Sequence, residues 1–477
     1  MNDSLKIPAR RRWPDYAALW RWHFYAGLFC LPFFCWLAIT GSLYLFRPDI
    51  EAWLDRPYES LHLEGPRATP ASEARAAVAA VPGSVFSHYE PPATATGAAQ
   101  VVVAREGYLY RVYVHPGSLQ AMHVGRDDHR IMELMSHLHG NLLLGTPGSM
   151  IVEMVGSWGV IMILTGVCLW FPRGTKRLGG LLYPRLRGHG RLFWRDLHSV
   201  TGVWICAVTL FLLLSGLPWA ASWGSYFTWV RNHWTATAGK PDWSLGGKEE
   251  PIPTMAHDMH MSHMASPNAK SAISAAEMAA MRPPATGKDA MQPPLDLDAL
   301  STVVPVAAGL GVPRPLWILP PSPGERDWIV SSRNQDRTQR VSYAIDPNGA
   351  VSGRKVFGDD DAVNRTINVA ISAHEGHLFG RPNQAILLLN AIGVLLVAIS
   401  SAVMWWRRRP AHLLGAPRPG ASPRTSALLA LGCALLVLTV LLPLFGASLL
   451  LILLLERLVL PRRSSLRRWL GLGAGSA

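Results

Sequence analysis

Four histidines occupy matched positions in an internal repeat. The segments "WRWHFYAGLFC" and "WRDLHSVTGVW" both begin with Trp-Arg, and they carry His23 and His198. The segments "HGNLLLG" and "HEGHLFG" begin with His139 and His374, each six residues before a glycine. Neutral imidazole is a common metal ligand, and two facing imidazoles are an axial ligand set of a six-coordinate haem b. The repeated spacing therefore predicts two histidine pairs, each holding one haem b.

The pairs follow from the apolar stretches beside the histidines. A membrane-spanning helix needs about 20 apolar residues, and such stretches occur at 24–46, 149–171, 199–222 and 384–406. His23 and His198 begin helices that leave one membrane face, so we call them the inner pair. His139 and His374 precede helices that return from the other face, and we call them the outer pair. A helical bundle around each pair would exclude water from the cofactor.

The remaining apolar sequence and the basic segments predict the topology. The stretch 426–460 is interrupted by "PLFG", which predicts a hairpin of two short helices and six spans in total. Basic residues crowd beside the spans, as in "ARRRW", "WWRRRP" and "PRRSSLRRW", a pattern typical of cytoplasmic loops. We therefore expect a multi-pass protein of a bacterial inner membrane, surrounded by lipid, with the long intervening segments in the periplasm.

Charge and cysteine content exclude other classes. The net charge is +13, but the basic residues lie beside the spans and accompany no nucleic-acid motif, so we expect no nucleic-acid partner. All five cysteines fall inside apolar stretches, and no CxxC occurs. The exported segments therefore have no disulfide framework, and the cysteines indicate neither thiol redox chemistry nor a zinc ribbon.

The exported segments also resemble each other. Each has a predicted helix, at 69–81 and 294–310, followed by alternating strands and hairpin turns, at 107–124 and 336–355. The predicted fold is a membrane all-α helical bundle, made of a four-helix haem core and a C-terminal hairpin, with two small α+β periplasmic modules. The predicted boundaries are a first helix within 1–46, module 1 at 47–147, helices 2 and 3 at 148–222, module 2 at 223–382, helix 4 at 383–409 and the hairpin at 424–461.

Glycines in register with the histidines could leave room for a macrocycle. Gly27 and Gly202 lie one helical turn from the inner pair. Gly41 and Gly216 lie five turns from the inner pair on the same face, roughly 27 Å deeper at 1.5 Å per residue. That depth suits an outer cofactor. Glycine-rich helix faces also serve as packing surfaces in membranes, so the four glycines have an alternative role.

Other residues near the histidines have candidate roles. Arg21 and Arg195 could neutralise the propionates of an inner haem. His137 and His377 lie close to the outer pair, and each could replace its neighbour as the ligand, contact a substrate or cap a helix. No residue pattern indicates a catalytic acid, base or nucleophile.

The motifs "RWHFYAGLFC", "ITGSLYLF", "LHGNLLLG", "RDLHSVTGVW", "HEGHLFG" and "MWWRRR" resemble the PepSY-associated transmembrane family over residues 16–408. The resemblance implies four core spans and two PepSY-type modules. It also implies His23, His139, His198 and His374 as haem-ligand candidates. Some members of the family are inner-membrane di-haem reductases that reduce ferric siderophores in the periplasm and release Fe(II).

We therefore expect a haem-dependent transmembrane ferric reductase that carries electrons from the inner to the outer pair and then to a ferric siderophore or another ferric chelate. No dinucleotide fingerprint occurs, so the electron donor is expected to be a separate reductase, reduced flavin or quinol on the cytoplasmic side. One alternative is a non-enzymatic PepSY membrane protein that binds or regulates a partner. Another is a haem electron carrier to copper or a partner protein, and the Met/His-rich segment 255–267 leaves copper open.

Overall fold

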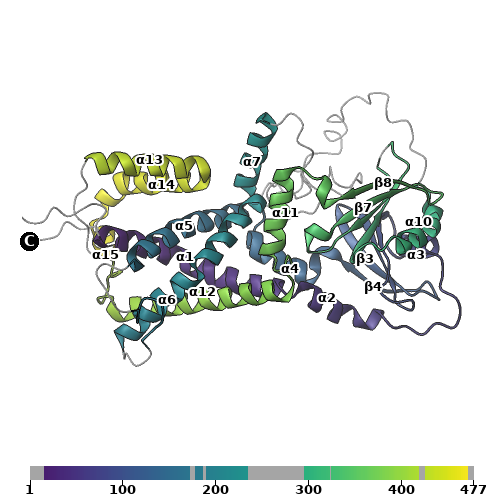
Figure 1. Cartoon of the computed structure of the whole chain (residues 1–477), viewed down its shortest axis with the longest axis horizontal. Helices are drawn as coiled ribbons and strands as arrows, with labels where there is room; N and C mark the ends of the chain where they lie inside the picture. Colours follow the sequence, from purple (N-terminus) through teal and green to yellow (C-terminus); the bar gives the residue numbers. More distant parts are fainter. Residues whose placement is uncertain are drawn as a thin grey trace, which may run out of the picture.

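The computed structural model describes residues 16–171, 178–185, 190–234, 295–322, 324–417 and 425–470. Figure 1 shows a bundle of long helices on one side and a β-sheet region on the other, with short helices between them. The Met/His-rich segment 255–267 lies outside the described residues.

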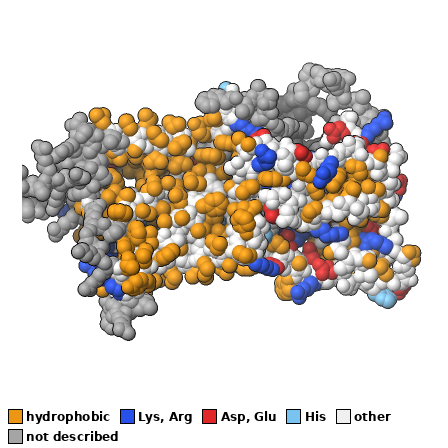
Figure 2. Space-filling model, in the orientation of Figure 1, with side chains coloured by type: hydrophobic (Ala, Val, Ile, Leu, Met, Phe, Trp, Pro, Cys, Tyr) orange, Lys and Arg blue, Asp and Glu red, His pale blue; other side chains and the backbone are white. Residues whose placement is uncertain are grey.

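Four long apolar helices form the bundle. They are α1 (Tyr16–Tyr44), α5 (Thr146–Trp170), α6 (Arg191–Gly216) and α12 (Arg381–Arg408). All four are long and apolar enough to cross a membrane. Figure 2 shows a broad band of hydrophobic side chains over the bundle, whereas charged side chains gather over the sheet region. This distribution is that of a membrane-embedded bundle with a polar domain at one end.

The predicted repeat is visible at the start of two helices. Gly145 precedes α5 with φ 63°, and Gly380 precedes α12 with φ 62°. A backbone with positive φ is readily adopted by glycine. Proline follows in the first turn of both helices, where its missing N–H breaks no helical bond. The two halves of the chain therefore enter their second membrane helix in the same way.

Five candidate spans are found among the described residues, one fewer than the predicted six. The C-terminal hairpin is present as α13 (Thr425–Leu441) and α14 (Pro443–Leu458). Only α14, extended to Arg462, joins the four bundle helices among the five candidate spans found in the described residues. Leu442 and Pro443 divide the apolar run, which leaves α13 with 17 residues, about 26 Å at 1.5 Å per residue. This length is shorter than a typical hydrocarbon core of about 30 Å.

The strands of the two predicted α+β modules join in one sheet, which the sequence did not predict. Their strands form one antiparallel eight-stranded sheet in the order β4-β3-β2-β1-β5-β6-β7-β8. The strands are β1 (Val85–Glu90), β2 (Ala99–Arg105), β3 (Tyr108–Val114), β4 (Ala121–Arg126), β5 (Leu316–Leu319), β6 (Trp328–Ser332), β7 (Val341–Ile345) and β8 (Val351–Val356). Strands β1 and β5 meet at the pair Tyr89 and Ile318. Each module thus covers the strand edge that the other would leave open.

A shared hydrophobic core also joins the modules. Helices α3 (Pro70–Ala80) and α10 (Leu300–Gly309) contact each other and the sheet. Ala77 from one module and Leu300 and Trp328 from the other are buried in the same cluster. Both helices were predicted from sequence, but the common core was not, because alternation of apolar residues does not reveal which sheet a strand joins.

Short helices that were not predicted lie between the sheet and the bundle, as Figure 1 shows for α4 and α11. They are α2 (Arg47–Asp55), α4 (Ile131–Asn141), α7 (Ala221–Trp234) and α11 (Ala362–His374). The short helix α15 (Ser464–Trp469) follows α14. Asp361 begins α11 by accepting bonds from two backbone N–H groups of the first turn. His139 and His374 lie in the last turns of α4 and α11.

Two candidate bis-histidine sites

The inner pair is brought together inside the bundle. The ring centres of His23 on α1 and His198 on α6 are 6.2 Å apart, and their planes are inclined at 81°. His23 Nδ1 lies 2.9 Å from the Met162 carbonyl oxygen. His198 Nδ1 lies 3.2 Å from the Val397 carbonyl oxygen. Because a carbonyl oxygen only accepts, each Nδ1 donates and each Nε2 is left as a bare lone pair.

The outer pair is held by hydroxyl groups instead. His139 Nδ1 lies 3.0 Å from Thr40 Oγ1. His374 Nδ1 lies 2.8 Å from Ser215 Oγ. Both hydroxyls also lie within bonding distance of the carbonyl one turn earlier in their own helices. When a hydroxyl gives its proton to that carbonyl, its oxygen accepts from the imidazole, and Nε2 is again left bare.

Burial keeps the outer pair neutral. It lowers the pKa of His139 to about 4. Burial, together with repulsion from His139, lowers the pKa of His374 to about 3. His374 also packs edge-on against Trp219, with 5.6 Å between the ring centres. Metal binding requires neutral imidazole, so this environment favours the ligating form at neutral pH.

Glycines leave room for the imidazole rings. A Cβ on Gly41 would lie 3.1 Å from His139 Cε1, and a Cβ on Gly216 would lie 3.5 Å from His374 Cε1. Both glycines therefore lie directly against the outer pair, at the depth expected from their spacing. Near the inner pair, a Cβ on Gly166 would lie 3.0 Å from His23 Cε1. Gly166 was not among the predicted site residues.

Gly27 and Gly202 lie farther from the rings. The nearest atom to a Cβ on Gly27 is Met162 Sδ, at 3.8 Å. The nearest atom to a Cβ on Gly202 is Val397 Cγ2, at 4.0 Å. These glycines therefore face the residues whose carbonyls hold the inner histidines, which again matches the two halves of the repeat.

The inner histidine pair fits the ligand requirement of a haem. Two metal–nitrogen bonds of about 2 Å and about 1 Å from each nitrogen to its ring centre add up to about 6 Å. The separation of 6.2 Å in the inner pair agrees with this sum. In the part of the chain that is described, no group of three or more His, Cys, Asp or Glu side chains is arranged to hold a metal ion. A pair of imidazoles suits a porphyrin, which supplies the other four ligands itself.

The two predicted propionate partners have protein partners in the structure. Arg195 donates to Asp196 at 2.8 Å, and Asp196 also binds Arg185. Arg21 donates to the Pro417 carbonyl at 3.0 Å. These contacts fix loop segments against the bundle ends. A role of either arginine toward a propionate stays a prediction.

The two spare histidines differ in their surroundings. His137 Nδ1 lies 3.4 Å from the Asn141 amide nitrogen, one turn along α4. His377 has a buried Nε2 with no hydrogen-bond partner among the described residues. Burial lowers the pKa of His377, against the opposing effect of Asp336. The matched hydroxyl contacts belong to His139 and His374. A ligand role for His137 or His377 stays a prediction.

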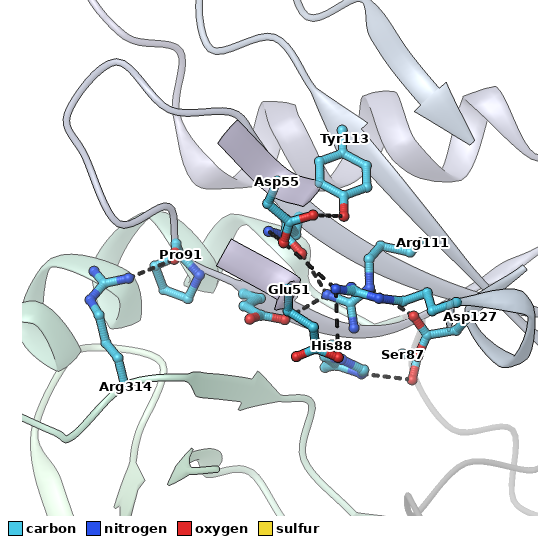
Figure 3. Close-up of polar contacts among 12 residues, drawn as sticks. Glu51, Asp55, Ser87, His88, Pro91, Arg111, Tyr113, Asp127 and Arg314 are labelled. Carbon is cyan, nitrogen blue, oxygen red and sulfur yellow. Dashed lines mark hydrogen bonds and ion pairs between the residues drawn. The ribbon is translucent and has the colours of Figure 1, made fainter. Parts of the chain in front are cut away.

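Ion pairs position α4 and hence His139. Arg47 at the start of α2 binds Glu133 on α4 at 2.5 Å. Figure 3 shows Asp55, at the end of α2, in contact with Tyr113 of the sheet, and the Tyr113 hydroxyl donates to Asp55 at 2.8 Å. Helix α2 thus links the sheet to α4 through charged and hydroxyl groups.

Sequence reasoning missed the hydroxyls that hold the outer pair. Thr40 directly precedes Gly41, and Ser215 directly precedes Gly216. A hydroxyl residue before each matched glycine was therefore visible in the repeat. Gly166 gave a weaker signal, because its counterpart in the second half, Ser401, is not a glycine.

A comparison with known protein families identifies the family of the chain. The family described as PepSY-associated TM region matches residues 20–408. The chain belongs to this family. The match covers the bundle, the sheet and all four histidines of the PepSY-associated chain, and it ends at Arg408, the last residue of α12. None of the curated proteins matches the sequence significantly.

Proposed function

We propose that this PepSY-associated protein is a di-haem b reductase of the bacterial inner membrane. In this proposal it moves electrons from the cytoplasmic side to a ferric chelate, such as a ferric siderophore, in the periplasm. One-electron reduction would release the metal as Fe(II), because chelators that prefer Fe(III) bind Fe(II) weakly. The chelator itself would stay intact and reusable.

One observation carries the proposal: all four histidines have Nδ1 within hydrogen-bond distance of a carbonyl or hydroxyl oxygen, in two pairs at opposite ends of the bundle. When Nδ1 donates to that oxygen, Nε2 is free to bind a metal. Ligating histidines typically donate the other ring N–H in this manner. When bound, each haem would supply a one-electron couple whose potential depends on its axial ligands and burial. The four-helix packing would exclude water from both sites.

The protein residues have separable tasks in this proposal. The inner pair, His23 and His198, is held by backbone carbonyls and would bind the cofactor near the cytoplasmic side. The outer pair, His139 and His374, lies on α4 and α11, next to the sheet. These short helices bring the outer site to the boundary of the bundle and the polar domain, where a soluble chelate has the shortest path to it.

The electron donor would be a separate component. A cytoplasmic reductase, reduced flavin or membrane quinol would meet the need for reducing equivalents. The basic residues near the ends of α1, α6 and α12 would face the cytoplasm under this topology.

The direct test uses purified protein reduced anaerobically with a stoichiometric amount of dithionite. Ferric siderophore is then added, and the absorption bands and Fe(II), trapped by a coloured Fe(II) chelator, are followed together. We expect reoxidation with matching release of Fe(II), and loss of this reaction in His374→Ala. Bands that stay reduced with every ferric chelate would contradict the proposal. Reoxidation by Cu(II) alone would favour the copper alternative.

A second candidate function has its own observation. An open groove of about 510 Å³ lies between the end of α10 and strands β7 and β8, and Arg340, Tyr343, Arg354 and Phe357 contribute to its lining. Such a groove favours a binding or regulatory role of the PepSY modules. This alternative predicts purified protein without stoichiometric haem and no effect of His198→Ala on partner binding.

A further inference from the structure

The two histidine pairs differ in the kind of acceptor that holds Nδ1. The inner pair donates to the carbonyls of Met162 and Val397. The outer pair lies against the side-chain hydroxyls of Thr40 and Ser215. A backbone carbonyl is present whatever the side chain, whereas a hydroxyl exists only for particular residue types. The outer site therefore depends on side-chain identity in a way that the inner site does not.

Each outer hydroxyl is itself fixed. Thr40 Oγ1 lies 2.9 Å from the Trp36 carbonyl, and Ser215 Oγ lies 2.7 Å from the Phe211 carbonyl. Thr40 is 3% exposed and Ser215 is 7% exposed, so water does not compete for these bonds. A buried hydroxyl that donates to a carbonyl becomes a better acceptor through cooperativity.

The hydroxyls act together with the glycines that follow them. Thr40 and Gly41 contact the same His139 ring, the first through Nδ1 and the second by leaving room beside Cε1. Ser215 and Gly216 contact His374 in the same way. Each hydroxyl–glycine pair thus fixes both the tautomer and the plane of one imidazole. The same arrangement arises from both halves of the repeat.

We propose that Thr40 and Ser215 are positioning residues that set the reduction potential of the outer haem independently of the inner one. The inference rests on the proposed function, since it requires a haem at the outer pair. A hydrogen bond at Nδ1 makes the imidazole a stronger donor, which stabilises Fe(III) and lowers the potential. Removing the hydroxyl raises the potential of that haem and frees the ring to turn.

The test measures both midpoint potentials of the purified full-length protein by spectroelectrochemical titration. Thr40→Val and Ser215→Ala each raise one of the two potentials and leave the other unchanged. We expect about a tenfold change in the equilibrium between the two haems, which is 59 mV for a one-electron couple. Equal shifts of both potentials, or no shift, would overturn the inference.

Thr165 supplies the matched control. Its hydroxyl lies 3.3 Å from His23 Nδ1, but the Met162 carbonyl lies closer, at 2.9 Å. Thr165→Val therefore leaves the inner potential unchanged, because His23 keeps its carbonyl acceptor. A shift in Thr165→Val as large as that in Thr40→Val would show that loss of any nearby hydroxyl has this effect, and it would overturn the inference.

A second variant, Thr40→Ser, keeps the test decisive if Thr40→Val loses the outer haem. Thr40→Ser keeps the hydroxyl and retains both wild-type potentials. If Thr40→Val loses the outer haem while Thr40→Ser keeps it, the hydroxyl is required to hold the ring, which supports the inference. If Thr40→Ser also loses it, Thr40 acts through packing, and the inference fails. Wild-type protein without haem would contradict the proposed function itself. A di-haem protein whose potentials are unaffected by Thr40→Val would contradict the inference alone.

Discussion

The ring centres of His23 and His198 lie 6.2 Å apart, although the whole first exported segment separates the two residues in the sequence. Each ring presents a bare Nε2 because a carbonyl holds its Nδ1. This relationship supports an account in which each histidine pair binds one haem. It also makes the consequences of single substitutions separable by site.

Loss of one histidine is expected to remove one haem of two. We expect His198→Ala to remove the inner haem and keep the outer one, and His374→Ala to do the reverse. Each haem would have its own histidine pair, and the Nδ1 acceptors of the two pairs lie on different residues. Haem quantified per chain, with the absorption spectrum of the remaining haem, checks this.

His233→Ala is the matched control for these variants. His233 Nδ1 also lies near the carbonyl one turn earlier, at 2.9 Å, but the residue is exposed on α7. This variant should keep both haems. An equal loss of haem in His233→Ala would show that the histidine variants act through misfolding.

Gly166→Ala is expected to disturb the inner site. The added methyl group would lie 3.0 Å from His23 Cε1, so the imidazole must move by a few tenths of an ångström. We expect lower inner-haem occupancy or a shifted inner potential. Gly156→Ala, on the same helix, meets no atom within 4 Å. It should keep both haems and gain about 0.5–1 kcal/mol from helix propensity. Similar haem spectra for the two variants would contradict the steric role of Gly166.

Acid should destabilise the sheet through His88. Burial, aided by the nearby Arg111 and Arg333 and opposed by Asp127, lowers the pKa of His88 to about 3. In the unfolded chain, His88 is protonated below about pH 6.5. In the folded protein, it stays neutral down to about pH 3. Stability is therefore lost as the pH falls from about 6.5 toward 3, by about 2 kcal/mol at pH 5.

The His88 effect is measured by comparing thermal unfolding of the wild-type protein and His88→Gln in detergent at pH 7.5 and pH 5. The variant lacks the titrating group, so its disadvantage should shrink by about 2 kcal/mol at the lower pH. A difference that is constant across this range would argue against a buried neutral His88.

Arg111→Met is expected to destabilise the polar domain strongly. Arg111 is 8% exposed at its side chain and binds Glu90 at 2.6 Å and Asp127 at 2.7 Å. Figure 3 shows Arg111 beside Asp127. Its removal takes the ion-pair partner from two carboxylates, at a cost of about 3–5 kcal/mol. Arg105→Met breaks an exposed pair with Glu106 and should cost under about 1 kcal/mol. Comparable melting temperatures of the two variants would refute the importance of the Arg111 cluster.

The helical bundle could be predicted from the sequence because membrane helices carry a strong local signal. The runs that became α1, α5, α6 and α12 are long, apolar and bordered by basic residues. The spacing of Gly41 and Gly216 also placed them at the depth of the outer histidines, because helical rise converts residue number directly into distance.

The single eight-stranded sheet could not be predicted from the sequence. Pairing of Tyr89 with Ile318 joins strands more than two hundred residues apart, and local alternation carries no information on such partners. The hairpin at 426–460 was predicted from its interruption and is present as α13 and α14, but the length of α13, 17 residues, keeps it out of the five candidate spans found in the described residues. Thr40 and Ser215 were missed because a hydroxyl in a membrane helix usually bonds its own backbone, as both also do here.

The most direct measurement is the absorption spectrum of the purified full-length protein, oxidised and dithionite-reduced, with haem quantified per chain. The account predicts two haems b per chain with the low-spin bands of bis-histidine ligation. One haem per chain would show that one of the pairs is wrong. No haem in protein from cells well supplied with it would contradict the central claim and leave the binding role of the modules as the better explanation.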